Sequence, residues 1–153
     1  MGQIDVKTPV GDVHITAEDG AITRVSWGQT QHDPGDEASL LHDAKSQLQA
    51  YFEGDLRAFD LPLFVKGSEF QRQVCAAMSA IPFGDTRTYG DIAAQLNAPP
   101  QAVGQACGGN PIPIIIPCHR VLAASGLGGF SAAGGVETKV ALLRHEGAAS
   151  LLI

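Results

Sequence analysis

The segment 109–122 constrains the fold more than any other part of the chain. Three prolines frame the apolar run 114–116, which is too short for a typical buried helix. Each proline ring fixes φ and removes a backbone donor, so we predict a buried extended segment with a rigid backbone. Such a segment delivers the residue that follows it, Cys118, to a defined position.

The first part of the chain predicts a small α/β unit. Between residues 4 and 27, short stretches alternate apolar and polar side chains and are separated by glycines and a proline, which is typical of an antiparallel meander. Apolar residues at three- and four-residue spacing over 38–52 predict an amphipathic helix that ends near Gly54. Proline and glycine in the segment 61–68 place a boundary between a domain of residues 1–65 and a domain of residues 66–153.

The second domain carries a helix-turn-helix pattern. Ser68 is a candidate N-cap for a first helix that Pro82 terminates, and two short helices follow over 91–96 and 101–108 with a turn between them. The helix 101–108 consists mostly of small side chains. Small residues permit close packing against another helix or close approach to a DNA groove, and the pattern leaves both open.

The composition is that of a folded protein, with one property that opposes a nucleic-acid partner. Hydrophobic residues make up 44% and charged residues 17% of the chain, and no apolar run is long enough to span a bilayer. Without a signal-peptide pattern, and with three cysteines that are too few for a disulfide scaffold, we expect free thiols and a cytoplasmic location. The net charge of −6 argues against binding to phosphates, although the acidic residues crowd the first third of the chain.

Cys118 is the candidate nucleophile. Its reactive form is the thiolate, so a thiol with an ordinary pKa of about 8.5 needs a base or a positive charge beside it. His119 is the nearest candidate base, and Glu146 follows a helix-patterned segment and is a candidate to orient that histidine. A packed, inert thiol is the alternative that local spacing leaves open.

The stretch GGNPIPIIIPCHRVL, preceded by FQRQVCAAMSAIPFGDTRTYGDIAAQL and followed by ALLRHEG, resembles the methylated-DNA protein-cysteine methyltransferases, also called alkylguanine-DNA alkyltransferases. The resemblance runs from Phe70 to Gly147 and implies a winged-helix domain with the active site, behind an N-terminal α/β domain of ribonuclease-H-like shape. It implies repair of double-stranded DNA by direct reversal. A nucleotide is flipped through the minor groove, and an alkyl group moves irreversibly from O6 of guanine, or O4 of thymine, to the cysteine. No cofactor and no metal are implied.

The same resemblance implies a role for each matching residue. Cys118 is the acceptor, His119 takes its proton through a water, and Glu146 holds His119. Asn110 bridges the two halves of the site, and Tyr89 donates a proton or hydrogen bond to the guanine ring. The residues expected to contact DNA or the extruded base are Gln101, Ala102, Val103, Gly104, Cys107, Arg120, Phe130 and Ser131.

Three positions depart from the family pattern. Gln101 stands where many members carry the arginine that fills the gap left by the flipped base, so we expect weaker duplex affinity or slower extrusion. Phe130 replaces a tyrosine, and the loop around Ser131 is about two residues longer than the commonest form. No cysteine precedes Cys75, which argues against the structural zinc site of some relatives.

Three other functions compete with this interpretation. A non-reacting binder of alkyl lesions lacks the acceptor cysteine, whereas Cys118 is present. A cysteine hydrolase built on Cys118, His119 and Glu146 turns over repeatedly, whereas an alkyl thioether is a stable end product. A transcriptional regulator of this type carries an extra domain, for which we expect no room in 153 residues. We expect a monomer.

Overall fold

The computed structural model describes residues 1–129 and 134–148. The chain divides into two compact units, Met1–Lys66 and Gly67–Ile153, each with its own buried core.

A three-stranded antiparallel sheet forms the centre of the N-terminal unit. It consists of β1 (Gly2–Thr8), β2 (Gly11–Glu18) and β3 (Ala21–Trp27) in sequential order, with Ile15 opposite both Ile4 and Val25. Side chains on one face are buried because strand residues alternate between the two faces. The predicted meander is confirmed.

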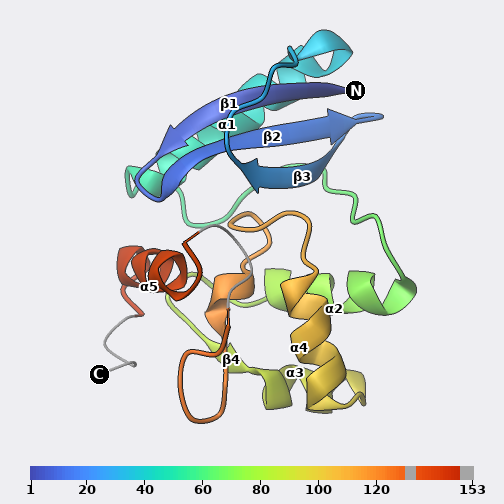
Figure 1. Ribbon diagram of the computed structural model, residues 1–153, viewed down its shortest axis with the longest axis vertical. Helices are drawn as coiled ribbons and strands as arrows, with labels where there is room; N and C mark the ends of the chain where they lie inside the picture. Colours follow the sequence, from blue (N-terminus) through green and yellow to red (C-terminus); the bar gives the residue numbers. More distant parts are fainter. Residues whose placement is uncertain (130–133, 149–153) are drawn as a thin grey trace. The chain divides into compact units, whose positions relative to one another are not determined.

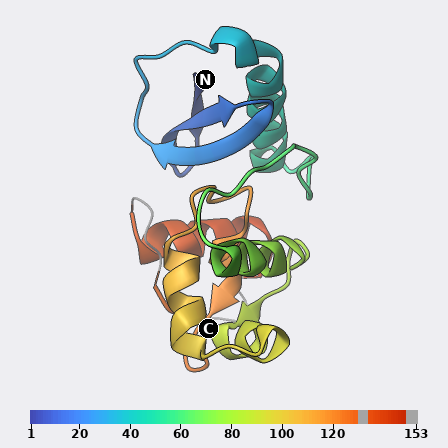
Figure 2. The ribbon, with the colours of Figure 1, turned by 90° about the vertical axis from the view of Figure 1, so that its right-hand side faces the viewer.

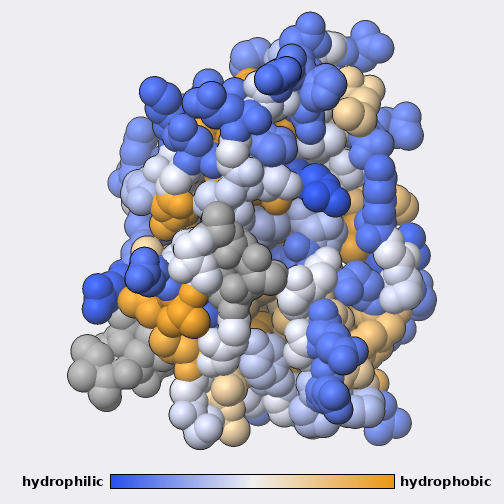
Figure 3. Space-filling view, viewed as in Figure 1, coloured by the Kyte–Doolittle hydropathy of each residue, from blue (hydrophilic) through white to orange (hydrophobic). Residues whose placement is uncertain are grey.

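One helix covers the sheet. After a short 3-10 turn, η1 (Gly35–Glu37), α1 (Ala38–Phe52) lies against one sheet face (Figure 1 and Figure 2). Its apolar stripe is fully buried, which confirms the predicted amphipathic helix. The buried residues are Leu41, Ala44, Leu48 and Tyr51. On the face shown in Figure 3, hydrophilic residues cover most of this unit, as expected for a segment rich in acidic side chains.

The segment after α1 returns to the sheet. Ile22 donates a hydrogen bond to the carbonyl of Pro62 at 2.8 Å, and Phe64 donates to the carbonyl of Ile22 at 2.9 Å. These two bonds add a short parallel pairing to the free edge of β3. The first part of the segment 61–68 is therefore an ordered edge of this sheet.

The C-terminal unit is mainly helical. It contains α2 (Glu69–Ser79), α3 (Tyr89–Leu96), α4 (Pro100–Gly108) and α5 (Val136–His145), with a parallel pair of two-residue strands, β4 (Arg87–Thr88) and β5 (Val121–Leu122). The pair α3 and α4 packs together as the predicted helix-turn-helix. Asn97 takes a left-handed φ of 53° at the turn between them.

Local sequence explains where two of these helices begin. Ser68 accepts a hydrogen bond from the backbone of Gln71 at 3.0 Å, which confirms it as the N-cap of α2. At α3, Thr88 and Asp91 each bond to the other's backbone N–H, forming a capping box. This box starts α3 at Tyr89, two residues before the predicted position.

The prediction for the segment before Cys118 is correct in burial and wrong in conformation. Ile112 and residues 114–116 are buried, but the chain folds back on itself, with Ile116 donating to the carbonyl of Ile112 at 2.9 Å. Ile114 has a φ of 73°, in the left-handed region. An extended segment needs a neighbouring strand for its donors and acceptors, and the prolines remove several of these donors, so a self-contained loop satisfies the backbone instead.

No helix within 1–129 or 134–148 combines the length and the apolar character that a membrane span requires.

Replacing Ser68 with alanine removes the side-chain acceptor at the start of α2. We expect the free energy of unfolding of the C-terminal unit to fall by about 1 kcal/mol. Urea denaturation followed by circular dichroism measures it. The matched control is Ser46→Ala, on the exposed face of α1, which we expect to leave stability within about 0.5 kcal/mol. Equal effects of the two substitutions contradict the capping role.

Candidate active site

Cys118 begins a short 3-10 turn, η2 (Cys118–Arg120), directly after the proline-rich loop. Its backbone N–H donates to Ile116 at 2.8 Å, and its side chain is only partly exposed. A left-handed β-branched residue costs on the order of 1–3 kcal/mol, and the full burial of Ile114 offsets this cost. The loop therefore holds Cys118 in a position that local backbone preference alone does not select.

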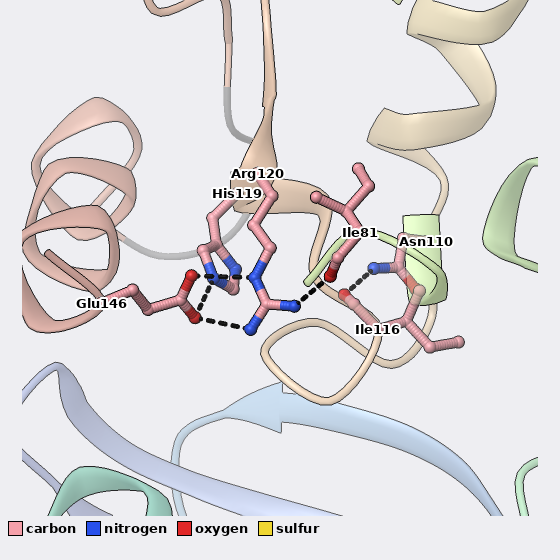
Figure 4. Close-up of polar contacts among 6 residues, drawn as sticks. All are labelled: Ile81, Asn110, Ile116, His119, Arg120 and Glu146. Carbon is pink, nitrogen blue, oxygen red and sulfur yellow. Dashed lines mark hydrogen bonds and ion pairs between the residues drawn. The ribbon is translucent and has the colours of Figure 1, made fainter. Parts of the chain in front are cut away.

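Asn110 links this loop to the thiol. Its side-chain amide donates to the carbonyl of Ile116 at 2.9 Å (Figure 4), and its side-chain oxygen accepts from the backbone of Ile112 at 3.0 Å. A side-chain hydrogen bond between Asn110 and Cys118 lowers the pKa of the thiol, opposing the larger effect of burial. Asn110 thus fixes both ends of the loop and contacts the candidate nucleophile.

His119, Arg120 and Glu146 form a buried cluster at the other end of the turn (Figure 4). Glu146 caps the C-terminus of α5 and lies 2.8 Å from His119 Nε2. Arg120 donates to both oxygens of the same carboxylate, through Nε at 2.8 Å and through the second nitrogen of its fork at 2.9 Å. Its remaining terminal nitrogen donates to the carbonyl of Ile81 at 2.6 Å. The side chains of His119 and Glu146 are fully buried.

The carboxylate determines which imidazole nitrogen is free to accept a proton. A carboxylate held by a guanidinium offers only acceptors, so the His119 nitrogen that faces Glu146, Nε2, carries the hydrogen. In a neutral imidazole, Nδ1 is then the acceptor. Nδ1 is buried and has no hydrogen-bond partner among the described residues. The cluster therefore presents one buried, unused base atom next to Cys118 in the sequence.

Burial shifts the pKa values of both groups in a consistent way. It raises the pKa of the Cys118 thiol, against smaller lowering effects of Asn110 and of the Lys139 charge. Burial also lowers the pKa of His119 below its ordinary value, although Glu146 opposes this. At neutral pH the resting pair is a thiol and a neutral imidazole, so the thiol requires a base and the histidine is in the form that can act as one.

Lys139 is a site residue that the sequence analysis missed. It projects from α5, is fully buried, and donates to the carbonyls of Val121 at 2.7 Å and Gly129 at 3.1 Å. Burial lowers its pKa, while the Cys118 and Cys107 thiolates raise it. Within residues 1–129 and 134–148, its ammonium group forms no ion pair with a carboxylate. The available signal was a lysine at a position on α5 whose helical neighbours are apolar.

Tyr89 lies next to this lysine. The ammonium group of Lys139 is 6.0 Å from the centre of the Tyr89 ring, and the ring is half-buried. A Cβ at Gly128 would lie 3.0 Å from the tyrosine hydroxyl, so only glycine permits this approach without displacement. Burial raises the pKa of Tyr89, and a hydrogen bond with the Gly129 backbone lowers it. Tyr89 is therefore a protonated donor at neutral pH.

The residues expected to contact DNA fall into different places. Gln101 is exposed at the start of α4, and Ala102 and Gly104 are partly exposed. Val103 and Cys107, at 0% and 6% exposure, face the interior instead, because helical spacing turns them toward α2 and α3. Burial raises the pKa of Cys107 to about 12, which makes it an unreactive thiol at neutral pH.

Arg120 also lies away from the expected DNA contact. It is 6% exposed, and its guanidinium bonds to Glu146 and to the Ile81 carbonyl. Its position favours a role inside the site. Phe130 and Ser131 fall outside the described residues. Within 1–129 and 134–148, no cluster of three or more His, Cys, Asp or Glu side chains could hold a metal ion.

Comparison with known proteins accounts for nearly the whole chain. Residues 5–65 match the 6-O-methylguanine DNA methyltransferase ribonuclease-like domain, and residues 69–148 match the DNA-binding domain of the same family. A methylated-DNA–protein-cysteine methyltransferase of Mycolicibacterium paratuberculosis is 42% identical over 149 residues, covering 92% of this chain and 89% of the relative. The constitutive enzyme of Bacillus subtilis is 42% identical over 152 residues, covering 92% of each chain.

The chain belongs to the 6-O-methylguanine DNA methyltransferase family.

A solved structure agrees with this assignment. Mycobacterium tuberculosis OGT in complex with DNA is similar to this chain with a TM-score of 0.84 and 38% identity, covering 99% of this chain and 95% of the other. The expected fold class, a ribonuclease-like α/β domain followed by a winged-helix DNA-binding domain, is confirmed. The partly exposed Cys118, beside the buried His119 and Glu146, is the candidate reacting group in this fold.

Replacing Lys139 with methionine tests its charge at the methyltransferase site. Because the Lys139 charge lowers the pKa of Cys118, its removal raises that pKa and reduces the thiolate fraction, roughly tenfold for each pKa unit. We expect iodoacetamide to alkylate Cys118 about tenfold more slowly at pH 7, measured by peptide mass mapping. Lys139→Arg preserves the rate to within about threefold, and Lys7→Met, at an exposed position of β1, leaves it unchanged. A wild-type rate in Lys139→Met refutes this electrostatic role.

Proposed function

We propose that this chain repairs alkylated DNA by direct reversal, moving an alkyl group from O6 of guanine, or O4 of thymine, to Cys118. The observation that carries the residue assignment is the free Nδ1 of His119, held in that state by the bond from Nε2 to Glu146. An acceptor atom in this position is what a protonated thiol needs before it can attack carbon. The membership of the family supports the same reaction.

The transfer balances with no cofactor. The proton of the Cys118 thiol moves to His119 Nδ1, directly or through a water, and the sulfur forms a bond to the alkyl carbon. The bond between that carbon and the guanine oxygen breaks, and its electron pair stays with the guanine. The guanine ring takes up one proton, so the net change exchanges the thiol hydrogen for the alkyl group. The thioether is stable, and the protein reacts once.

Tyr89 and Asn110 act on the two partners of the reaction. The raised pKa of Tyr89 keeps its hydroxyl protonated, so it donates to the guanine ring as negative charge develops there. Asn110 donates to the Cys118 sulfur and favours the thiolate. Ser131 and Phe130 remain proposed contacts of the extruded base, as the resemblance implies.

The exposed face of α4 is the proposed DNA contact, with Gln101, Ala102 and Gly104 toward the minor groove. A Cβ built at Gly104 meets nothing within 4 Å, so packing inside the unit does not require a glycine there. A glycine inside a helix costs roughly 0.5–1 kcal/mol relative to alanine. A close approach by an external surface explains this cost, and a DNA groove is such a surface.

The charge of the C-terminal unit sets how it binds. Residues 67–153 carry five Lys or Arg and five Asp or Glu, so the net charge of −6 belongs to the N-terminal unit. Two of the five cations, Arg120 and Lys139, are buried in the site, and the exposed ones are Arg72, Arg87 and Arg144. We propose that groove shape and base extrusion contribute more to binding than phosphate neutralisation does.

Three further statements belong to this proposal. Residues 1–65 and 66–153 act as separate domains, with all the named reacting groups in the second. The protein works as a monomer, because the reaction needs one acceptor and one extruded base. It acts in the cytoplasm, where the three cysteines, all free in the structure, stay reduced.

Intact-mass analysis after incubation with duplex DNA that contains O6-methylguanine tests the reaction. We expect a gain of about 14 Da, one methyl group in place of hydrogen, mapped to Cys118. Cys118→Ala shows no gain, and Cys107→Ala, which removes a buried thiol of the same unit, gains the same mass. Repeated turnover without a lasting adduct supports a cysteine hydrolase instead. Binding to the lesion without any adduct supports the non-reacting binder.

Gln101→Arg tests the base-extrusion step. Arginine adds a charge at the exposed start of α4, next to the phosphates, and we expect the transfer rate on duplex DNA to rise about tenfold. The rate with free O6-benzylguanine, which needs no extrusion, stays the same. Gln73→Arg, exposed on α2, adds the same charge away from α4 and serves as the control. An unchanged ratio of the duplex rate to the free-base rate in Gln101→Arg contradicts the role.

A further inference from the structure

Arg120 is 6% exposed, and its guanidinium bonds within the proposed site rather than at the surface. Two of its nitrogens donate to the two oxygens of Glu146, and a third donates to the Ile81 carbonyl. The same carboxylate accepts from His119 Nε2 at 2.8 Å. Figure 4 shows the guanidinium and the imidazole both bonded to the carboxylate of Glu146.

A purely structural ion pair is the simpler explanation, and the geometry argues against it. A buried ion pair contributes little net stability compared with apolar side chains of similar size. Arg120 is bidentate on the carboxylate, and this arrangement restricts rotation of the Glu146 side chain. A fixed carboxylate orientation matters for His119, because the same oxygen, Oε2, accepts from both Arg120 and the imidazole.

We infer that Arg120 is a positioning residue for the transfer to Cys118: it holds Glu146 ionised and oriented, so that His119 keeps its hydrogen on Nε2 and its acceptor on Nδ1. The inference rests on the proposed function. Without the guanidinium, a buried carboxylate is left uncompensated, and a proton binds to Glu146 or to His119 at a higher pH than before. Either protonation removes the Nδ1 acceptor or weakens the bond that fixes it.

The charged and titratable groups around His119 set the direction of this change. Glu146, from α5, raises the pKa of His119, while Arg120, from η2, and Lys139, from α5, lower it, and burial has the largest effect, also lowering it. Cys118 precedes His119 on the same turn. Removing the Arg120 charge therefore raises the pKa of His119. As the pH falls, the neutral imidazole is then lost at a higher pH than in the wild type. With Arg120 present, this loss occurs below the ordinary histidine pKa of about 6.5.

The experiment measures the transfer rate from free O6-benzylguanine to Cys118 between pH 5.5 and 9, pH values chosen to bracket the histidine range. Free base is used so that DNA binding does not enter the rate. The variants are Arg120→Met, which removes charge and donors, and Arg120→Lys, which keeps the charge without the bidentate geometry. The control is Arg144→Met, which removes an exposed charge from α5, the helix that Glu146 caps. Circular dichroism checks that each variant is folded.

We expect Arg120→Met to shift the acid limb upward by about one pH unit, so that its rate relative to the wild type is constant near pH 8.5, falls as the pH drops below 7, and approaches a roughly tenfold loss only at pH values below both acid limbs. Arg120→Lys lowers the rate at every pH with a smaller shift, and Arg144→Met follows the wild type. If Arg120→Met does not fold, Arg120→Gln, which keeps donors without charge, provides the same comparison.

A pH-independent loss in Arg120→Met, or no loss, overturns the inference and leaves a structural ion pair. A folded variant whose acid limb moves to lower pH overturns it as well. The wild-type protein separates this result from a failure of the proposed function, because that function requires a methyl adduct on wild-type Cys118 after incubation with duplex DNA that contains O6-methylguanine. Absence of the adduct in the wild type refutes the proposed function, whatever the variants do.

Discussion

The buried carboxylate of Glu146 is the point on which the rest of the site depends. It lies at the end of α5 and accepts hydrogen bonds from two residues of η2, His119 at 2.8 Å and Arg120 at 2.8 and 2.9 Å. An unpaired carboxylate in this position is strongly disfavoured, so the helix end and the turn are tied together by the same group that fixes the imidazole. Stability and reactivity therefore depend on one pairing, and a change in either partner affects both.

In the proposed reaction, the two buried cations of the C-terminal unit have different roles. The charge of Arg120 is paired with the carboxylate of Glu146. Lys139 forms no ion pair within the described part of the chain, and its charge lowers the pKa of Cys118. The carbonyls of Val121 and Gly129 satisfy the lysine donors without cancelling the charge. The formation of the Cys118 thiolate supplies the missing negative charge, so this arrangement stabilises the reactive form more than the resting thiol.

Periodicity and capping were enough to predict most of the helices and strands, since the apolar stripe of α1 and the Ser68 cap are local properties. The local pattern made Glu146 only a candidate partner of His119, because the two lie 27 positions apart in sequence, and the resemblance gave it that role. Burial of Arg120 and Lys139 was not predictable, since long cations are rarely buried. The left-handed conformation of Ile114 was not predictable either, because a β-branched residue takes it only when tertiary packing imposes it.

The placement of the charges explains how a protein of net charge −6 has a DNA substrate. The excess acid lies in the N-terminal unit, and the C-terminal unit is neutral as a whole. Because two of its five cations are inside the site, few remain to neutralise phosphates. Under the proposed function, binding then depends on groove shape and base extrusion rather than on a strong non-specific field. In the proposed reaction, the buried cations act on Glu146 and on Cys118, whereas cations on the surface act on every phosphate alike.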